Sequence, residues 1–281
     1  MPFHSESSRK FEEGTFMAKK FTASKSLLEK YFSGCAHRAY LYKRWNLKPA
    51  YMPKPLKYGI NVHDLIEKGI SGEELYDKET LESDFTPSEI ERAERAINWI
   101  EKNGYEVLAT EVRHLAPLTD EIQLFGVIDV VALDRDGSPV LLDWKTSRGL
   151  WTPLTTEEGE IVYVGSQGWQ GPIYLTTPYE SSILKPSAWP DKMQYIIIPE
   201  FETVGVYDYF KNDPDDQALI QACRVVKTST DEGNFPKNKG YQCDAGFGCD
   251  FKKVCWEQKG WHKYYDPRTD AAQKQYDEEK K

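Results

Sequence analysis

Two carboxylates and one lysine interrupt an otherwise apolar stretch that runs from 124 to 148. The first apolar run contains Asp129, and the second ends at Asp143 and Lys145. The Asp-Gly pair at 136–137 between the runs is a strong hairpin signal. Burying an ionised group costs several kcal/mol unless the group is paired or binds a metal. The pattern therefore predicts two paired strands that carry a functional charged group.

The expected strand geometry also predicts which of these side chains meet. Successive side chains alternate between the two faces, so Asp143 and Lys145 should share one face with Trp144 on the other. The hairpin should bring Asp129 onto the neighbouring strand, near Asp143. Two acids beside a lysine fit a hard-cation site next to an amine that handles a proton or stabilises charge.

The size of the chain allows one large domain or two small ones, because it has 281 residues of which 40% are hydrophobic and 13% aromatic. No apolar run is long enough for a membrane span, and the polar start of the chain lacks the apolar core of a secretory signal. We therefore expect a cytoplasmic protein with no membrane partner. The net charge of −9 argues against a surface coated for nucleic acid but allows a local basic groove.

Helical periodicity and capping residues predict the remaining elements. A first helix should begin with a capping box from Ser26 to Glu29, and a later one should have Asp213 as its N-cap. Thr86 and Gly104 should cap the two ends of another helix. We expect helices over 56–70, 87–103, 166–175 and 213–228, further strands over 105–112, 194–198 and 204–209, and a mobile flap over 149–165.

Several polar residues in these elements have both an ordinary and a functional interpretation. His63, one turn after Gly59 on the second helix, is by itself more typical of a packed or surface histidine. Glu111 could be an exposed strand acid. Tyr174, one turn after Gln170, would by itself be assigned to the core.

Three late cysteines form a C-x5-C-x5-C pattern in a glycine-rich segment: Cys243, Cys249 and Cys255. A reducing environment makes disulfides unfavourable. The pattern suggests metal or an iron–sulphur cluster, with Cys35 as the natural fourth ligand, whereas Cys223 is expected in the core.

Taken in order, these features resemble the PD-(D/E)xK nuclease core, and most closely its RecB-like exonuclease branch. The matching features are Cys35, Gly59-x-x-x-His63, Glu111, Gly126-x-x-Asp129, Asp143-x-Lys145, Gln170-x-x-x-Tyr174 and the three late cysteines. The resemblance covers about 24–256.

The resemblance implies an α/β fold: a restriction-endonuclease-like core with a central mixed sheet flanked by helices, plus an N-terminal helical region and a C-terminal cysteine-bound segment. We accordingly divide the chain into a flexible tail (1–20), the N-terminal helical region (21–104), the nuclease core (105–230), the cysteine segment closing onto the N-terminal helix (231–262) and a charged tail (263–281).

The resemblance further implies a metal-dependent DNA exonuclease that acts on single-stranded or duplex ends in recombination, repair or phage DNA processing. Mg²⁺ or Mn²⁺ would be held by His63, Asp129, Asp143 and the Trp144 carbonyl. Lys145 would orient or deprotonate the attacking water, or stabilise the pentacovalent transition state. Gln170, Tyr174 and Glu111 complete the expected catalytic set.

Iron–sulphur relatives in this branch, the CRISPR-associated and AddB-type exonucleases, place one early and three late cysteines around a 4Fe-4S cluster. Their late spacing is usually C-x2-C-x5-C, and only the final gap agrees here. Zinc or no metal therefore stays open for Cys35, Cys243, Cys249 and Cys255.

Two other functions stay open. The same core could be a structure-selective or sequence-specific endonuclease. Alternatively, the chain could be an inactive nucleic-acid-binding or assembly subunit. No Walker A pattern is present, so a helicase or recombination protein would act as a separate partner.

Overall fold

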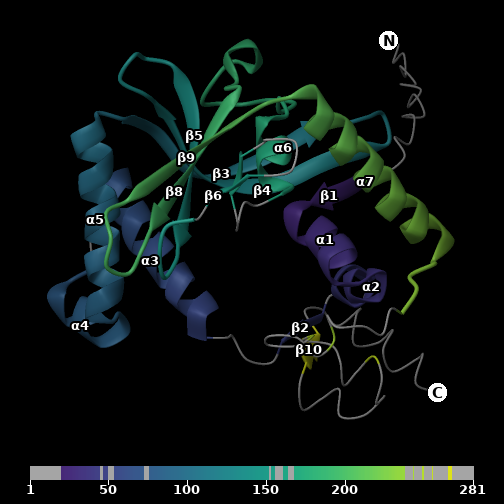
Figure 1. Ribbon diagram of the computed structural model, residues 1–281, viewed down its shortest axis with the longest axis horizontal. Helices are drawn as coiled ribbons and strands as arrows, with labels where there is room; N and C mark the ends of the chain where they lie inside the picture. Colours follow the sequence, from purple (N-terminus) through teal and green to yellow (C-terminus); the bar gives the residue numbers. More distant parts are fainter. Residues whose placement is uncertain are drawn as a thin grey trace, which may run out of the picture.

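Six strands form one mixed β-sheet in this computed structural model (Figure 1). The structure describes residues 20–44, 47–49, 54–72, 76–151, 153–155, 161–163, 168–237, 243, 249, 255 and 265–267. The strand order is β1-β4-β5-β8-β9, and β3 also pairs with β4. The strands are β1 (Phe21–Ser24), β3 (Glu106–Pro117), β4 (Ile122–Leu133), β5 (Pro139–Thr146), β8 (Lys192–Ile198) and β9 (Gly205–Phe210). β1 with β4 and β5 with β8 are parallel, and the other pairs are antiparallel.

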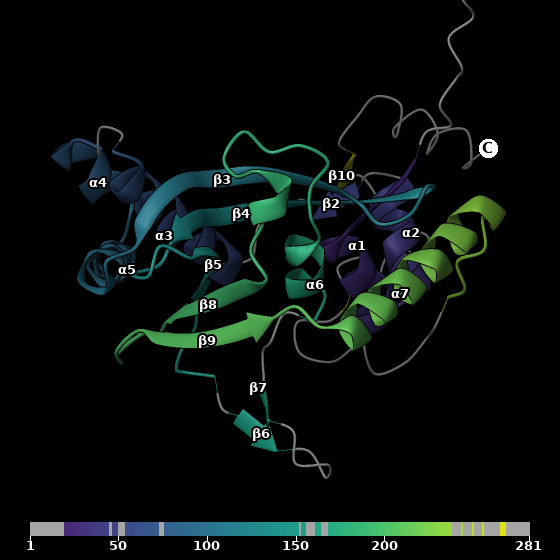
Figure 2. The same cartoon turned by 90° about the horizontal axis from the view of Figure 1, so that it is seen from above.

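Helices cover both faces of this sheet (Figures 1 and 2). One group packs with the larger hydrophobic cluster: α1 (Lys25–Glu29), the π-helical turn η1 (Lys30–Gly34), α2 (Ala36–Arg44), α6 (Gln170–Leu175) and α7 (Asp213–Glu232). The other group lies over the second cluster: α3 (Lys54–Ser71), α4 (Lys78–Asp84) and α5 (Pro87–Asn103). A mixed sheet flanked by helices is the α/β arrangement predicted from the sequence, and that prediction is confirmed.

Smaller elements lie outside the central sheet. β2 (Leu47–Pro49) pairs with β10 (Tyr265–Pro267), and β6 (Pro153–Thr155) pairs with β7 (Ile161–Tyr163). The 3₁₀ turn η2 (Pro186–Ala188) precedes β8. Figure 2 shows the β6–β7 hairpin away from the central strands. It occupies part of the predicted flap at 149–165.

Local sequence signals explain the central hairpin and the cap of α5. Asp134 accepts hydrogen bonds from the backbone N–H groups of Asp136 and Ser138, and Gly137 adopts a φ of 77° that favours glycine. The capping box of Thr86 and Glu89 is present at α5 as predicted.

Two predicted helix starts are wrong. The capping box at Ser26 does not form, because α1 begins at Lys25 with Ser24 as its N-cap. Ser24 is fixed there by its place in β1, a strand that the sequence analysis did not predict. The N-cap of α7 is Asn212 rather than Asp213, since the Asn212 side chain accepts the hydrogen bond from Asp215 N.

Helix α1 is too short to be stable by itself, with only five residues. Its stability comes from Leu27 and Leu28, which are both buried in the larger hydrophobic cluster. Each such side chain contributes about 1.5–3 kcal/mol when fully buried.

The division of the chain into five segments stays a prediction. Apart from Lys20, the predicted N-terminal tail lies outside the described residues, as do most of the cysteine segment and of the charged tail. Within the described part, Phe235 of the cysteine segment contacts Tyr31 and Tyr40, and the last predicted segment contributes β10. None of the helices described is both long and apolar enough to cross a membrane.

Candidate active site at a fork in the sheet

One edge of strand β4 pairs with two different strands in turn, and we call the place where these two strands separate the fork. β3 pairs with the other edge over almost its full length. Along the forked edge, β1 pairs with residues 122–125 and β5 with 130–133. No described strand pairs with residues 126–129 on that edge, so the polar backbone groups there need other partners.

Side chains bond to backbone groups of both strands where β4 and β5 separate. Oδ2 of Asp129 accepts a 2.8 Å hydrogen bond from the backbone N–H of Trp144, at the point where β5 leaves the ladder. The Tyr174 hydroxyl, from α6, donates a 2.6 Å hydrogen bond to the carbonyl of Val127. The Tyr174 ring lies over Gly126, where a Cβ atom would overlap it. The Gly126 and Tyr174 positions of the sequence pattern therefore belong to one packing arrangement.

Asp143 is held on both of its carboxylate oxygens. Lys145 Nζ donates to Oδ2 and Gln170 Nε2 donates to Oδ1. Asp143 is 1% exposed, and Trp144 packs into the second hydrophobic cluster on the opposite face. The predicted alternation of Asp143, Trp144 and Lys145 is therefore confirmed. Gln170 Oε1 is buried and has no hydrogen-bond partner among the described residues.

Side chains of β4 alternate between the two faces of the sheet, and this alternation is interrupted at Asp129. Ile128 packs in the larger cluster and Val130 in the second, although both are even-numbered. Across the ladder from Asp129, Glu111 adopts a φ of 47°, which is unusual for a residue with a side chain. Such a conformation costs ~1–3 kcal/mol and is typical of functional sites. Burial, and then the charges of Glu67 and Asp143, raise the pKa of Glu111.

Helix α3 brings His63 to the fork. His63 Nδ1 lies 3.4 Å from Asp129 Oδ2, and the ring also contacts the Trp144 backbone. Gly59 allows this approach, since an added Cβ would lie 3.3 Å from Thr146 Oγ1 at the end of β5. Burial lowers the pKa of His63, although the charge of Asp143 opposes the shift. The neutral ring that results is the form that ligates metals.

A pocket of about 580 Å³ opens beside these groups. We call it the acidic pocket, because Asp64, Glu67, Glu111 and Asp129 line it and no lysine or arginine among the described residues does. Its other lining residues are Pro55, Leu56, Gly59, Ile60, His63 and Thr146. Asp143, Lys145, Gln170 and Tyr174 are not among the lining residues, so the sequence-predicted set divides between the pocket and the buried groups next to it.

The electrostatics of Asp129 and Asp143 fit a divalent cation. Burial, and then the charge of Asp143, raise the pKa of Asp129 well above its usual value, while Lys145 lowers it. A hard cation favours carboxylate and carbonyl oxygens and would relieve this repulsion. Within the described residues, no three His, Cys, Asp or Glu side chains converge as metal ligands. The two carboxylate oxygens of Asp143 instead accept hydrogen bonds from Lys145 and Gln170.

Comparison with known proteins identifies this arrangement. Residues 22–256 match the family model of the PD-(D/E)XK nuclease superfamily. The chain belongs to the PD-(D/E)XK nuclease superfamily. The match includes the fork, α3 and α6, and confirms the resemblance seen in the sequence.

One solved structure shares the fold of this nuclease at low sequence identity, and a second is less similar. A crystal structure of a proposed exonuclease from Eubacterium rectale superposes with a TM-score of 0.50 at 13% identity, covering 79% of this chain and 85% of that one. The crystal structure of SSO0001 gives a TM-score of 0.42 at 15% identity, covering 86% and 89%. No curated protein matches the sequence.

One charged residue near the acids was not predicted from the sequence. Lys25, the first residue of α1, interacts electrostatically with Lys145, Asp143 and Asp129. Burial and then the charge of Lys145 lower its pKa. No local sequence signal could have indicated this, because β1 places Lys25 there and β1 depends on pairing with β4.

Three of the four cysteines predicted to bind a cofactor act electrostatically on the fourth, Cys255. Burial raises the pKa of Cys255 to about 11, with contributions from Cys35, Cys249 and Cys243, while Lys237 lowers it. Cys249 N donates a 3.2 Å hydrogen bond to Cys243 O. As at the fork, no three His, Cys, Asp or Glu side chains among the described residues converge as metal ligands here. Cys223 lies in the core as predicted, and burial raises its pKa to about 12.

Proposed function

We propose that this nuclease is a metal-dependent DNA exonuclease whose catalytic centre is the fork of β4 and β5. The observation that carries the proposal is the pairing of Asp129 with the backbone beside Asp143, while Lys145 contacts Asp143. A buried acid, a partly buried acid beside it and one amine are costly next to a core without a cation to bind.

The proposed metal ligands are Asp129, Asp143, His63 and the Trp144 carbonyl. A bound Mg²⁺ or Mn²⁺ would neutralise charge on the scissile phosphate and lower the pKa of a bound water. Lys145 is proposed to hold the attacking water or to stabilise the charge that develops on the phosphate.

The supporting residues would keep this centre in place. Gln170 fixes the orientation of Asp143, Tyr174 fixes the backbone of Val127, and Glu111 adds a carboxylate at the pocket. These contacts support a positioning role for Gln170 and Tyr174 rather than direct contact with the reacting phosphate.

Exonuclease action on DNA ends is supported by the RecB-like order of motifs. The test is digestion of end-labelled linear DNA and of closed circular DNA with Mg²⁺ or Mn²⁺. We expect stepwise loss of nucleotides from linear DNA and no cleavage of the circle. Cleavage of the circle would instead identify an endonuclease, and no cleavage of either substrate would favour an inactive binding subunit. Asp143→Asn is the negative control.

We also propose that Cys35, Cys243, Cys249 and Cys255 hold a 4Fe-4S cluster. The electrostatic effect of the other three cysteines on Cys255 supports this, because a bound cation would relieve the repulsion between thiolates. Iron, sulphide and zinc analysis of anaerobically purified protein is the test. Zinc alone, or no metal, would overturn the cluster without affecting the nuclease proposal. A Cys35→Ala variant should lose the bound iron.

The proposed setting is the cytoplasm, in recombination, repair or phage DNA processing. A helicase or recombination protein stays a predicted partner. Co-purification of a tagged chain with such a protein, against an untagged control, tests that prediction.

A further inference from the structure

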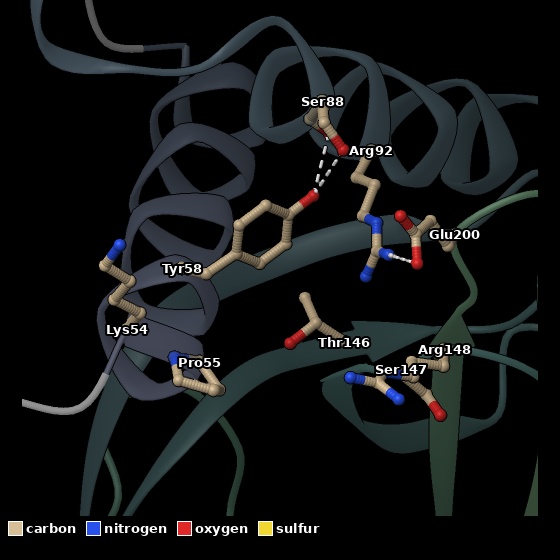
Figure 3. Close-up of a pocket in the computed structure, with 9 residues that line it drawn as sticks. All are labelled: Lys54, Pro55, Tyr58, Ser88, Arg92, Thr146, Ser147, Arg148 and Glu200. Carbon is tan, nitrogen blue, oxygen red and sulfur yellow. Dashed lines mark hydrogen bonds and ion pairs between the residues drawn. The ribbon is translucent and has the colours of Figure 1, made fainter.

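A second pocket, of about 340 Å³, adjoins the acidic pocket and shares Pro55 and Thr146 with it. Figure 3 shows the residues around it, which come from the start of α3, from α5, from the end of β5 with the two residues after it and, for Glu200, from the segment between β8 and β9. Its volume lies within the roughly 300–1,000 Å³ that is usual for ligand sites.

The two pockets have opposite charge. Lys54, Arg92 and Arg148 line the second pocket, and Glu200 is the one acid among its described lining residues, so we call it the basic pocket. In a chain with a net charge of −9, three cations beside the acidic pocket form a local exception. The change of sign occurs at Thr146, the residue that follows Lys145.

Arg92 is built into the wall of the basic pocket. It is 6% exposed, and its Nε has no hydrogen-bond partner among the described residues. Its guanidinium lies 4.9 Å from the centre of the Tyr58 ring, and the Tyr58 hydroxyl is held by Ser88 (Figure 3). The nearest carboxylate, on Glu200, is 3.9 Å from Nη2, which is a long ion pair. Arg92 is therefore a buried, oriented cation whose charge is only weakly compensated.

Neither of the other two cations has such support within the described part of the chain. Lys54 and Arg148 are both exposed, and neither forms an ion pair or a side-chain hydrogen bond with another residue in the described part of the chain. Lys54 is also the first residue of α3, so the positive end of that helix dipole adjoins the pocket. These features suit a phosphate group.

We propose that the basic pocket binds a phosphate of the DNA strand next to the phosphate held in the acidic pocket. The proposal rests on the proposed function, because it takes the acidic pocket as the place of cleavage. Arg92 would provide a fixed contact, while Lys54 and Arg148 would close on the phosphate from the rim. The acidic pocket repels DNA in the absence of metal, so the basic pocket would supply much of the affinity for the strand.

The test is binding of a fluorescein-labelled single-stranded oligonucleotide by anisotropy, in EDTA and over a series of salt concentrations. We expect Lys54→Gln combined with Arg148→Gln to weaken binding about tenfold and to reduce the salt slope by about one. Both replaced residues are exposed, so folding should be retained. Lys57→Gln combined with Arg224→Gln is the matched control, since both are exposed and neither lines the pocket.

A variant with the opposite expected effect makes the test sharper. Glu200→Gln removes the one acid of the pocket and should tighten binding about threefold, because Arg92 is then uncompensated. Glu121→Gln, an exposed acid on the turn before β4, should leave binding unchanged. Unchanged affinity in both pocket variants would overturn the proposal.

Further measurements distinguish a terminal from an internal phosphate, and the basic-pocket proposal from the nuclease proposal. Oligonucleotides with a 5′-phosphate, a 3′-phosphate or no terminal phosphate should bind equally if the pocket holds an internal phosphate. Preference for one end would place a terminal phosphate there and overturn the internal assignment. Cleavage with unaltered binding in the pocket variants would remove only the basic-pocket proposal. Loss of binding in a chain that never cleaves DNA would remove only the nuclease proposal.

Discussion

The backbone N–H of Trp144 donates a 2.8 Å hydrogen bond to Oδ2 of Asp129, and this bond links β4 and β5 where their ladder ends. A side chain thus takes the place of a strand carbonyl. The same bond places the Asp129 carboxylate beside Asp143, which makes the end of the ladder a charged site.

Replacement of Asp129 should separate stability from activity. The pKa of Asp129 is raised by burial and by Asp143, so the charged carboxylate destabilises the metal-free fold. That destabilisation is absent below the unfolded pKa and develops as the pH rises through the folded pKa. Asp129→Asn should therefore raise the melting temperature in EDTA at pH 7.5. Metal-dependent cleavage should fall by more than about 100-fold, the upper end of the cost of losing even a supporting partner of a metal ligand.

Asp136→Asn is the matched control for Asp129→Asn, since Asp136 is an exposed acid in the turn of the same hairpin. It should leave both the melting temperature and cleavage unchanged. A lower melting temperature for Asp129→Asn in EDTA would contradict the assigned direction of the pKa shift.

Gly126→Ala should destabilise the fold by about 1–3 kcal/mol, because the new methyl group would overlap the Tyr174 ring and overpack the fork. Urea unfolding measures the change. Gly149→Ala should be close to neutral, because no atom lies within 4 Å of its added Cβ. Tyr174→Phe keeps the ring and loses the hydrogen bond to Val127, so it should cost about 1 kcal/mol. Equal effects for the two glycine variants would refute this packing argument.

Glu111→Gly should not destabilise the protein, unlike substitutions to glycine elsewhere in a strand. The φ of 47° at Glu111 strains a residue that carries a side chain, and glycine relieves that strain. Glu106→Gly, in the same strand without a positive φ, should cost roughly 0.5–1 kcal/mol and serves as the control. If Glu111 is catalytic, cleavage at limiting metal should decline in both Glu111→Gly and Glu111→Gln. Thermal unfolding and cleavage rates, measured together, test the two parts.

Acid should destabilise the fold through His114. This residue is 1% exposed, its Nε2 lies 3.0 Å from the Ile173 carbonyl, and its ring stacks on Trp189. Burial lowers its pKa to about 4, against an ordinary value of 6.5. The unfolded chain therefore binds more protons between these values, so stability is complete above pH 6.5 and is lost as the pH falls toward 4.

The expected loss from His114 between pH 7.5 and pH 5 is about 2 kcal/mol. Urea unfolding at the two pH values measures it. His114→Phe keeps an aromatic ring against Trp189 and should reduce the pH-dependent loss by that amount. His37→Phe is the comparison, because His37 is only partly buried and should have a smaller effect. An identical pH dependence in wild type and His114→Phe would exclude His114 as the cause.

The sequence alone determined the hairpin, its charged residues and the main helices. Asp-Gly at the turn, the capping box at Thr86 and the apolar runs are local signals, and each depends on residues close in the chain. The order of Gly59-x-x-x-His63, Asp129, Asp143-x-Lys145 and Gln170-x-x-x-Tyr174 also carried the family assignment. The roles of the cysteines and of the individual site residues stay predictions.

Only the tertiary structure decided where the strands separate. The fork exists because β1, which lies about 100 residues before β4 in the sequence, pairs with β4 and ends before it reaches β5. That pairing also fixed Ser24 as a cap and placed Lys25 near the acids. The basic pocket likewise joins α3, α5 and the end of β5, which no local pattern relates. Contacts between distant segments depend on packing and strand register, and local periodicity does not contain them.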